Sequence, residues 1–345
     1  MTKWIREDLR NFKPYTVEDV GYAVKLDANE SPFYLPGPVK QALIRWLERD
    51  ENLNLYPDTS STQLREKIAA FWNVSAENVT CGVGSDQIID CITKAFLETS
   101  DSILTIEPTF SMYAQSALIN KGKVISLKSD EDIIKEAQDP QNNVKLLFLC
   151  TPNNPTGHNM TPHTITKILK ELDIPVVVDE AYAEFSETSI INYINEYPNL
   201  IVLRTFSKAF GLAGARVGYA LAHKDLIKAI DIVRPPYNLS ALSQQMAVLA
   251  LENNLVYKER VQMLKKERER VFDALKDNQN LTVYRSDANF LYIESLQDIG
   301  ALLKEHGIAV RKFPHGDDGL FRIRVTIGLP AQNDAVVTAL LKGDV

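Results

Sequence analysis

The chain is poor in cysteine and has no long apolar run. Its three cysteines, Cys81, Cys91 and Cys150, form no CxxC pair and are odd in number. Their apolar surroundings predict buried free thiols in a reducing compartment. No stretch approaches the roughly 20 apolar residues that a membrane-spanning helix needs. The charged start MTKWIREDLRNF also lacks an apolar signal core. We therefore expect a cytoplasmic protein with no membrane partner.

Positive charge is also scarce, because 38 Lys and Arg residues stand against 45 Asp and Glu, a net charge of −7. This balance argues against nucleic acid or an anionic membrane as the main partner. A local cationic pocket for a small anion is still compatible with it. The 345 residues, 45% hydrophobic and 24% charged, are typical of a globular protein with two packed domains, or one large domain with an extension.

Short apolar runs alternate with helical patterns between residues 78 and 222. Runs such as KLLFLC and PVVVDE show no polar alternation, which is typical of strands covered on both faces. In the helical stretches, Ile88, Ile89 and Ile92 share one face, and Thr161-Pro162 predicts a helix start. The pattern predicts an α/β fold with a mostly parallel, doubly wound sheet. The expected strands are 78–81, 102–106, 123–127, 145–150, 175–178 and 200–204, with 216–222 as a further candidate.

The pattern of expected helices and strands changes after Pro235-Pro236. Residues 240–276 are nearly all helical in pattern, and LTVYRS, NFLYIE and LFRIRVTIG then read as strands around a helix near 299–305. These features predict a smaller α+β domain. We expect an N-terminal arm over 1–28 that packs on the small domain or a partner subunit. A large domain would span 29–238 and a small one 239–345.

Polar segments follow five of the predicted strands: GVGSDQ, EPTFSMY, TPNNPTG, DEAY and TFSK. Ligands of such sheets bind at the carboxyl ends of the strands, so these segments are expected to converge. Taken alone, each of these segments also has an ordinary structural explanation. GVGSD is compatible with a plain turn and TPNNPTG with a structured loop. Asp179 is compatible with a helix cap, or with a buried anion that has a cationic partner, and Lys208 with a solvated helix end.

Taken together, the segments predict a site for pyridoxal 5′-phosphate (PLP). A lysine forms an imine with its aldehyde, a buried carboxylate pairs with the ring nitrogen, and hydrogen-bond donors meet the phenolic oxygen. A helix N-terminus and an arginine hold the phosphate. For this chemistry Lys208 needs a depressed pKa, which burial and a nearby cation would provide. No metal ligands are assigned.

These motifs resemble those of fold-type I PLP-dependent aminotransferases, most closely the histidinol-phosphate aminotransferase branch. The likeness runs from about Lys13 to Gly328, nearly the whole chain. TPNNPTG and TFSKAFGLAGARVGY are strong signatures of the superfamily, and LDANESP with Arg311 and Arg324 points to the branch. The other matching motifs are LYPD, GVGSD, EPTFSMY, VVVDEAY, RPPYN, IAVRK and LFRIRVTIG. Leu55 before YPD and the glutamine after GSD depart from the usual family pattern.

The resemblance implies a large domain with a seven-stranded sheet, a smaller domain and a homodimer with shared active sites. Lys208 would bind the cofactor and move a proton, and Asp179 would keep the ring nitrogen protonated. Asn154 and Tyr182 would bond the phenolic oxygen, and Phe110 would stack on the ring. The phosphate would be held by Ser85, Asp86, Thr205, Ser207 and Arg216, with Tyr56 of LYPD reaching the neighbouring subunit.

The resemblance also implies the substrates, histidinol phosphate and glutamate or 2-oxoglutarate. They would be bound by Tyr15, Asn29, Arg311 and Arg324. Two arginines thirteen residues apart on neighbouring elements suit a carboxylate or a phosphate, although each is equally compatible with a surface ion pair. Three alternatives stay open: an aromatic amino-acid aminotransferase, a threonine-phosphate decarboxylase and a non-catalytic regulator. A regulator of this kind would carry a DNA-binding region, for which we expect no room before LDANESP.

Overall fold

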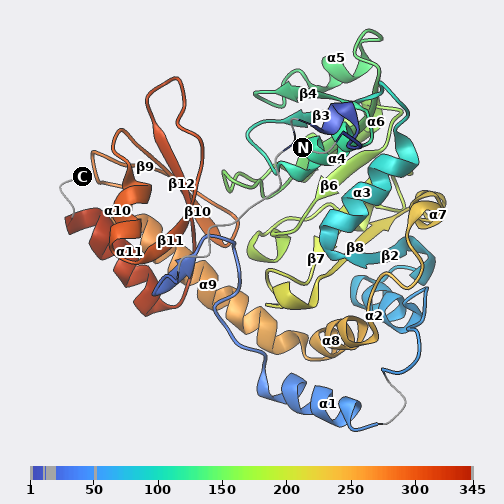
Figure 1. The fold of residues 1–345 in the computed structure, drawn as a ribbon, viewed down its shortest axis with the longest axis horizontal. Coiled ribbons are helices and arrows are strands. Elements are labelled where there is room, and N and C mark those ends of the chain that lie inside the picture. Colours follow the sequence, from blue (N-terminus) through green and yellow to red (C-terminus); the bar gives the residue numbers. More distant parts are fainter. Residues whose placement is uncertain (1–2, 11, 13–20, 50–52, 343–345) are drawn as a thin grey trace.

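The fold has two β-sheets, each covered by helices and joined by a long helix, as a computed structural model shows (Figure 1). The structure describes residues 3–10, 12, 21–49 and 53–342. No helix in these ranges is long and apolar enough to cross a membrane. Cys81, Cys91 and Cys150 are free thiols, as predicted; Cys81 and Cys91 are buried as expected, whereas Cys150 is only partly buried.

The larger sheet has seven strands in the order β2-β8-β7-β6-β5-β3-β4. Only β8 pairs antiparallel with its neighbours, so the other strands end at one edge of the sheet. The strands are β2 (Val79–Val83), β3 (Ser102–Ile106), β4 (Lys123–Leu127), β5 (Val144–Cys150), β6 (Val176–Asp179), β7 (Leu200–Thr205) and β8 (Val217–Ala222).

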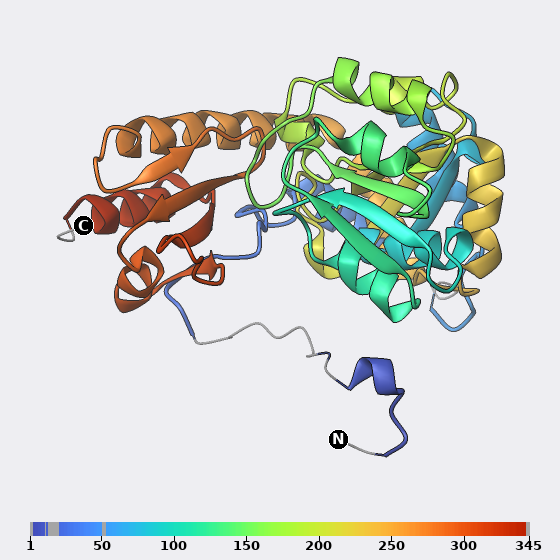
Figure 2. The ribbon, with the colours of Figure 1, turned by 90° about the horizontal axis from the view of Figure 1, so that it is seen from above.

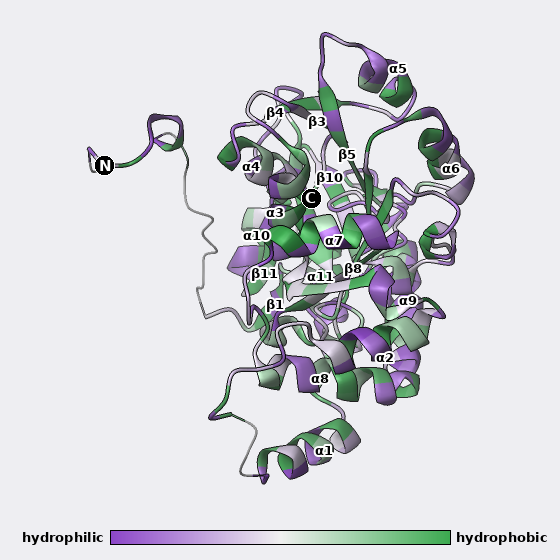
Figure 3. Cartoon of the chain, turned by 90° about the vertical axis from the view of Figure 1, so that its right-hand side faces the viewer, coloured by the Kyte–Doolittle hydropathy of each residue, from purple (hydrophilic) through white to green (hydrophobic). Residues whose placement is uncertain are grey.

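Both faces of this sheet are buried, which explains the unbroken apolar runs of its strands. Along β6, Val176 and Val178 join one apolar core while Val177 joins the other. On the Val177 side the sheet packs against α3 (Gly84–Phe96), α4 (Met112–Ile119) and α7 (Lys224–Val233). The opposite side carries α2 (Thr62–Trp72), α5 (Ile133–Gln138), α6 (Pro162–Glu171) and α8 (Ala241–Glu252), with α1 (Gly37–Leu47) beyond α8. Figure 3 shows the mixed polar and apolar surfaces of these outer helices.

The smaller sheet has five strands in the order β1-β11-β12-β10-β9. It lies beside the larger domain (Figure 2) and packs on three helices. Its strands are β1 (Val24–Leu26), β9 (Thr282–Tyr284), β10 (Phe290–Ser295), β11 (Ile308–Lys312) and β12 (Phe321–Thr326). The helices are α9 (Asn254–Leu275), α10 (Ile299–Glu305) and α11 (Pro330–Lys342).

The predicted fold class is confirmed, down to the seven strands of the large sheet. Three local details differ from the sequence interpretation. The helix after β2 begins at Gly84 rather than after the GVGSD segment, and the helical run over 240–276 is broken at Asn253. Within the expected arm, β1 pairs in parallel with β11 and so belongs to the small sheet. The domain boundaries at 28 and 238 stay predictions.

Candidate active site

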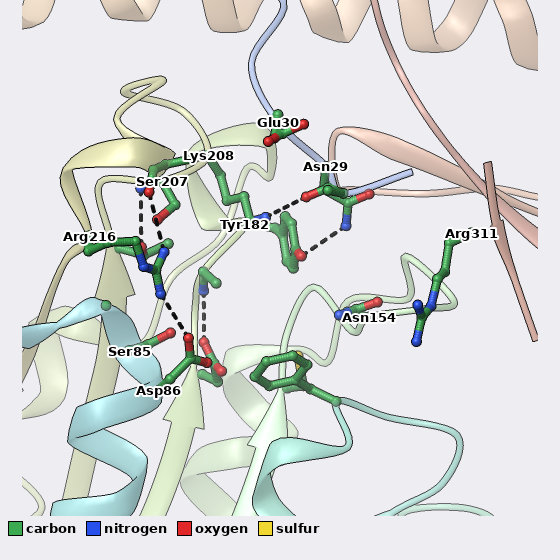
Figure 4. A pocket seen from close by; sticks show the side chains of 18 of the residues that line it. Asn29, Glu30, Ser85, Asp86, Asn154, Tyr182, Ser207, Lys208, Arg216 and Arg311 are labelled. Atoms are coloured by element: carbon green, nitrogen blue, oxygen red, sulfur yellow. Dashed lines mark hydrogen bonds and ion pairs between the residues drawn. The ribbon is translucent and has the colours of Figure 1, made fainter. Parts of the chain in front are cut away.

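A cavity of about 420 Å³ lies at the carboxyl ends of the large sheet, against strands β11 and β12 of the small one. Five polar segments that follow β2, β3, β5, β6 and β7 reach it, as the sequence predicts. Figure 4 shows Lys208 and Tyr182 directed into this space, with Arg216 and Asp86 on one side and Arg311 on the other. Its lining includes Asn29, Ser85, Asp86, Phe110, Asn154, Asp179, Tyr182, Thr205, Ser207, Lys208, Arg216, Arg311 and Arg324.

Of the predicted site residues that the structure describes, Tyr56 alone does not line this cavity. Tyr15 lies outside the described residues. Tyr56 is 81% exposed and stacks on Tyr237, with ring centroids 4.6 Å apart.

Lys208 lies in the tight loop after β7, and its Nζ donates to the carbonyl oxygen of Ala28 at 2.9 Å. Burial, aided by the positive charge of Arg324, lowers the pKa of this lysine to about 8. A lysine with such a pKa is in part unprotonated near neutral pH. Its amine is therefore available as a nucleophile and as a base.

Asp179 is the last residue of β6 and is 2% exposed. Its Oδ1 accepts a hydrogen bond from the Ala181 N–H at 3.1 Å, and its Oδ2 accepts one from the Tyr113 hydroxyl at 2.7 Å. Burial raises the pKa of this carboxyl to about 6 despite both bonds. The sequence interpretation allowed a helix cap or a pair with a cation. In the structure the carboxylate is buried, and the protein itself holds it through two neutral donors.

The neighbouring Glu180 anchors the loop that carries these residues. It is 1% exposed and forms an ion pair of 2.7 Å with Arg204 of β7, which also binds Glu184 at 2.9 Å. The Ile190 N–H donates to Glu180 at 2.7 Å. A buried ion pair with added hydrogen bonds costs much to break, so it fixes the loop between β6 and Tyr182.

One end of the cavity is formed by the N-terminus of α3. Arg216 reaches over it, and its Nη2 lies 2.9 Å from Asp86 Oδ2. Glycine is required here, because a Cβ on Gly218 would lie 2.4 Å from the backbone of Gly84 and Ser85. A Cβ on Gly84 would lie 2.5 Å from the Arg216 guanidinium. The backbone N–H groups of a helix start and an arginine together suit a phosphate.

At the other side, Arg324 and Arg311 face each other across β12 and β11 as register partners. The Arg324 guanidinium donates to Asn154 Oδ1 at 2.5 Å and to the Asp27 carbonyl oxygen at 2.6 Å. Because Asn154 accepts through its oxygen, its NH₂ group is left to donate elsewhere. The two arginines therefore lie on adjacent strands, an arrangement suited to a planar oxyanion, and their role in substrate binding stays a prediction.

Comparisons with known proteins agree with this geometry. The family described as "Aminotransferase class I and II" matches residues 23–340. The chain belongs to this aminotransferase family. It is 44% identical over 350 residues to a histidinol-phosphate aminotransferase of Ruminiclostridium cellulolyticum, with 97% of each chain covered. A second histidinol-phosphate aminotransferase, from Caldanaerobacter subterraneus, is 39% identical over 343 residues, again with 97% of each covered.

Among solved structures, the histidinol-phosphate aminotransferase of Sinorhizobium meliloti in complex with pyridoxal 5′-phosphate has a similar fold. Its TM-score is 0.87 at 24% identity, and the match covers 99% of this chain and 97% of that one. The predicted family is confirmed by the family match and the curated relatives, and the predicted cofactor agrees with the aminotransferase family and with the pyridoxal 5′-phosphate named for that structure.

The cavity of this aminotransferase fits PLP on three counts. The glycine cradle at the start of α3, with Arg216, suits the phosphate. The carboxyl of Asp179, whose pKa is raised to about 6, is the partner that a protonated ring nitrogen would stabilise. Lys208, with a pKa lowered to about 8, would bind the aldehyde.

The sequence interpretation quoted two segments without assigning residues that the structure brings to the site. Tyr113 of EPTFSMY bonds Asp179 and lies in the first turn of α4. Thr326 of RIRVTIG bonds Asn29 and lies two residues after Arg324. The strand period carried a signal for Thr326, since i, i+2 residues of a strand share a face.

Proposed function

We propose that this aminotransferase transfers an amino group between L-histidinol phosphate and 2-oxoglutarate, giving imidazole acetol phosphate and glutamate, a step of histidine biosynthesis. The names of its relatives support this assignment. The observation that carries it is the arginine pair Arg311–Arg324, which lies across the cavity from the α3 phosphate cradle. A second anion-binding group beside the cofactor site is what a phosphorylated substrate requires.

When bound, the cofactor supplies an electron sink for negative charge that develops at the substrate Cα. The amine of Lys208, unprotonated in part because of its lowered pKa, would serve as the base that moves the proton of that carbon. Asp179 would keep a proton at the ring nitrogen by its charge. Burial of its carboxylate makes this interaction stronger than it would be in water.

The remaining side chains orient the cofactor and the substrate. Tyr182 and Asn154 would donate to the phenolic oxygen, and Phe110 would stack on the ring. Ser85, Asp86, Thr205, Ser207 and Arg216 would hold the phosphate through side chains or backbone amides, Asp86 through its N–H at the start of α3. We further propose a homodimer in which Tyr56 completes the phosphate site of the partner subunit. Its exposure of 81% supports this role.

On the substrate side, Arg324 would bind an anion in both half-reactions, and Arg311 would favour the phosphorylated substrate with help from Tyr15. Asn29 is assigned to the substrate by family resemblance, but its amide is bonded to Tyr182 and Thr326. A role through Tyr182 therefore fits this side chain better than direct substrate contact.

A substrate panel tests the proposal. With 2-oxoglutarate as acceptor, we expect histidinol phosphate to react far faster than histidinol, phenylalanine or threonine phosphate, with no release of CO₂. Loss of one charge-assisted bond in a partly desolvated pocket costs about 2–5 kcal/mol. Arg324→Ala should therefore slow both half-reactions by at least about 30-fold. Arg311→Ala should slow the histidinol phosphate half-reaction more than that of glutamate.

Matched lysine variants serve as the control for charge. Arg311→Lys and Arg324→Lys keep one positive charge but lose the planar fork, so partial rescue is expected. If the wild-type enzyme uses histidinol as well as histidinol phosphate, no phosphate pocket exists and the aromatic aminotransferase alternative is favoured. Release of CO₂ from threonine phosphate would favour the decarboxylase alternative.

A further inference from the structure

Strand β12 of the small sheet reaches both residues that are assigned to the cofactor's phenolic oxygen. Arg324 contacts Asn154 directly. Thr326, two residues further and on the same face of the strand, contacts Tyr182 through Asn29. These contacts join a strand of the small sheet to loops of the large sheet, so the two domains meet at the cofactor site through specific hydrogen bonds.

The direction of the second connection follows from the donors present. The Asn29 N–H donates to Thr326 Oγ1 at 2.9 Å, and a backbone N–H has no alternative to donating. The Thr326 hydroxyl proton then goes to Asn29 Oδ1, at 3.1 Å. This bond orients the amide so that its Nδ2 faces the Tyr182 hydroxyl and donates to it at 2.9 Å. Tyr182 accepts this bond, so its own proton points away from Asn29.

Asn29 is held rigidly in this position. It is fully buried, at 0% exposed, and has a positive φ of 54°. Its carbonyl oxygen accepts from the Asn289 side chain at 3.2 Å. The ring of Tyr182 packs edge-on against Phe290 of β10, with centroids 5.1 Å apart. Both side chains are buried, and the Thr326 hydroxyl sets the sense of the hydrogen bonds, because it accepts from the Asn29 N–H and donates to Asn29 Oδ1.

We propose that Thr326 is a positioning residue which, through Asn29, keeps the hydroxyl proton of Tyr182 directed at the phenolic oxygen of the bound cofactor. This inference rests on the proposed function. A bond donated to the phenolic oxygen stabilises its anionic form and favours loss of a proton from the cofactor–lysine chromophore. Hydrogen bonds in series strengthen one another, so the bond from Asn29 makes Tyr182 a better donor.

Other charged and titratable groups also face Tyr182. Arg324 comes from β12, Cys150 from β5 and Asp179 from β6, and the Lys208 Nζ lies 5.8 Å from the tyrosine ring centroid. None of these residues is changed when the Thr326 hydroxyl is removed. A shift in the titration of the bound cofactor would therefore report the hydrogen bonds that connect Thr326, through Asn29, to Tyr182.

The test is a pH titration of the visible absorbance of the holoenzyme, reconstituted with PLP. Thr326→Val removes the hydroxyl and keeps the shape of the side chain. We expect the absorbance midpoint to rise by about 0.5 to 1 pH, the equivalent of one net hydrogen bond. Thr326→Ser should titrate as the wild type does. Thr80→Val is the matched control, since Thr80 is also a buried strand threonine, 1% exposed and bonded to Asp231, and should cause no shift.

A Tyr182→Phe background shows whether the effect passes through the tyrosine hydroxyl. In that background, Thr326→Val should add no further shift. Asn29→Asp gives an independent variant if Thr326→Val fails to fold. An ionised aspartate has no proton to donate, so Tyr182 would donate to it instead of to the cofactor. The midpoint should therefore rise by more when Tyr182 is present than in the Tyr182→Phe background.

Two outcomes would overturn the inference alone: a Thr326→Val titration equal to that of the wild type, or a shift of the same size after Tyr182→Phe. A wild-type protein that takes up no PLP would contradict the proposed function as well, so the two failures are distinguishable.

Discussion

Two ionisable groups, the buried Asp179 and the partly buried Lys208, face the same cavity, and the pKa of each is shifted toward that of the other. Burial raises the pKa of the Asp179 carboxyl to about 6 and lowers that of the Lys208 amine to about 8. Each shift reflects a charged form that lacks full compensation in the protein alone. Active sites often contain charged groups that are destabilised in this way, because the ligand supplies the compensating interaction.

Burial of the Asp179 carboxylate lowers the stability of the fold, and this effect can be measured without any substrate. In protein freed of PLP, Asp179→Asn is expected to raise the free energy of unfolding by about 2–3 kcal/mol at pH 7.5. The folded pKa of about 6 lies above the ordinary 3.8, so the folded state binds more protons between these values. Stability from this group is present at low pH and is lost as pH rises through the folded pKa. Urea unfolding of both proteins at pH 7.5 and pH 4.5 measures the difference.

The increase in the free energy of unfolding caused by Asp179→Asn should be smaller at pH 4.5, where Asp179 is mostly protonated in the folded protein. The same variant should lower transamination by orders of magnitude, because the neutral amide no longer holds a proton on the ring nitrogen. Equal unfolding free energies at pH 7.5, or near-normal turnover, would show that the carboxylate is only a structural group.

Sequence reasoning located the residues of this site that directly follow strands. Asp179 and Lys208 were predicted because their motifs end apolar runs, and such ends meet at one edge of a parallel sheet. Tyr113 and Thr326 act through other side chains, so no strand-end position marks them. The neutral partner of Asp179 was also not predictable, because it comes from a helix 66 residues away in sequence.

Among the elements, β8 and the start of α3 are in close backbone contact. Gly218→Ala should lower the free energy of unfolding by about 1–3 kcal/mol, since the new Cβ would lie 2.4 Å from the backbone of Gly84 and Ser85. Displacement of this helix start should also weaken PLP binding at least about tenfold. Urea unfolding of the cofactor-free protein and a PLP titration measure the two effects.

Gly37→Ala in α1 is the matched control, because a Cβ there meets no atom within 4 Å. It should leave stability and PLP binding almost unchanged. Normal PLP binding by Gly218→Ala would show that the α3 cradle does not hold the phosphate.

Element boundaries were predicted best where apolar runs end sharply. The bounds of β3 and β4 agree with the expected 102–106 and 123–127. The direction of β8 could not be predicted, because an apolar run has the same composition in either direction. β1 is three residues long and pairs with β11 some 280 residues later, so neither its length nor its partner leaves a periodic signal.

For the whole molecule, the exposed Tyr56–Tyr237 pair leads to a prediction about assembly. If Tyr56 completes the partner's phosphate site, then mixing two inactive variants, Lys208→Ala and Tyr56→Ala, should restore part of the activity. A hybrid dimer has one site with both residues intact. Activity after subunit exchange, with each variant alone as the control, measures this. A fully active monomer in sedimentation would contradict shared sites.

The central claim is that Lys208 binds the cofactor in the cavity between the two sheets. The most direct test is borohydride reduction of the PLP-loaded protein, followed by digestion and mass mapping. We expect one labelled site, Lys208, and no fixed label in Lys208→Ala, which should still take up PLP through the α3 cradle and Asp179. A label on another lysine of the wild-type protein, or none at all, would contradict the account.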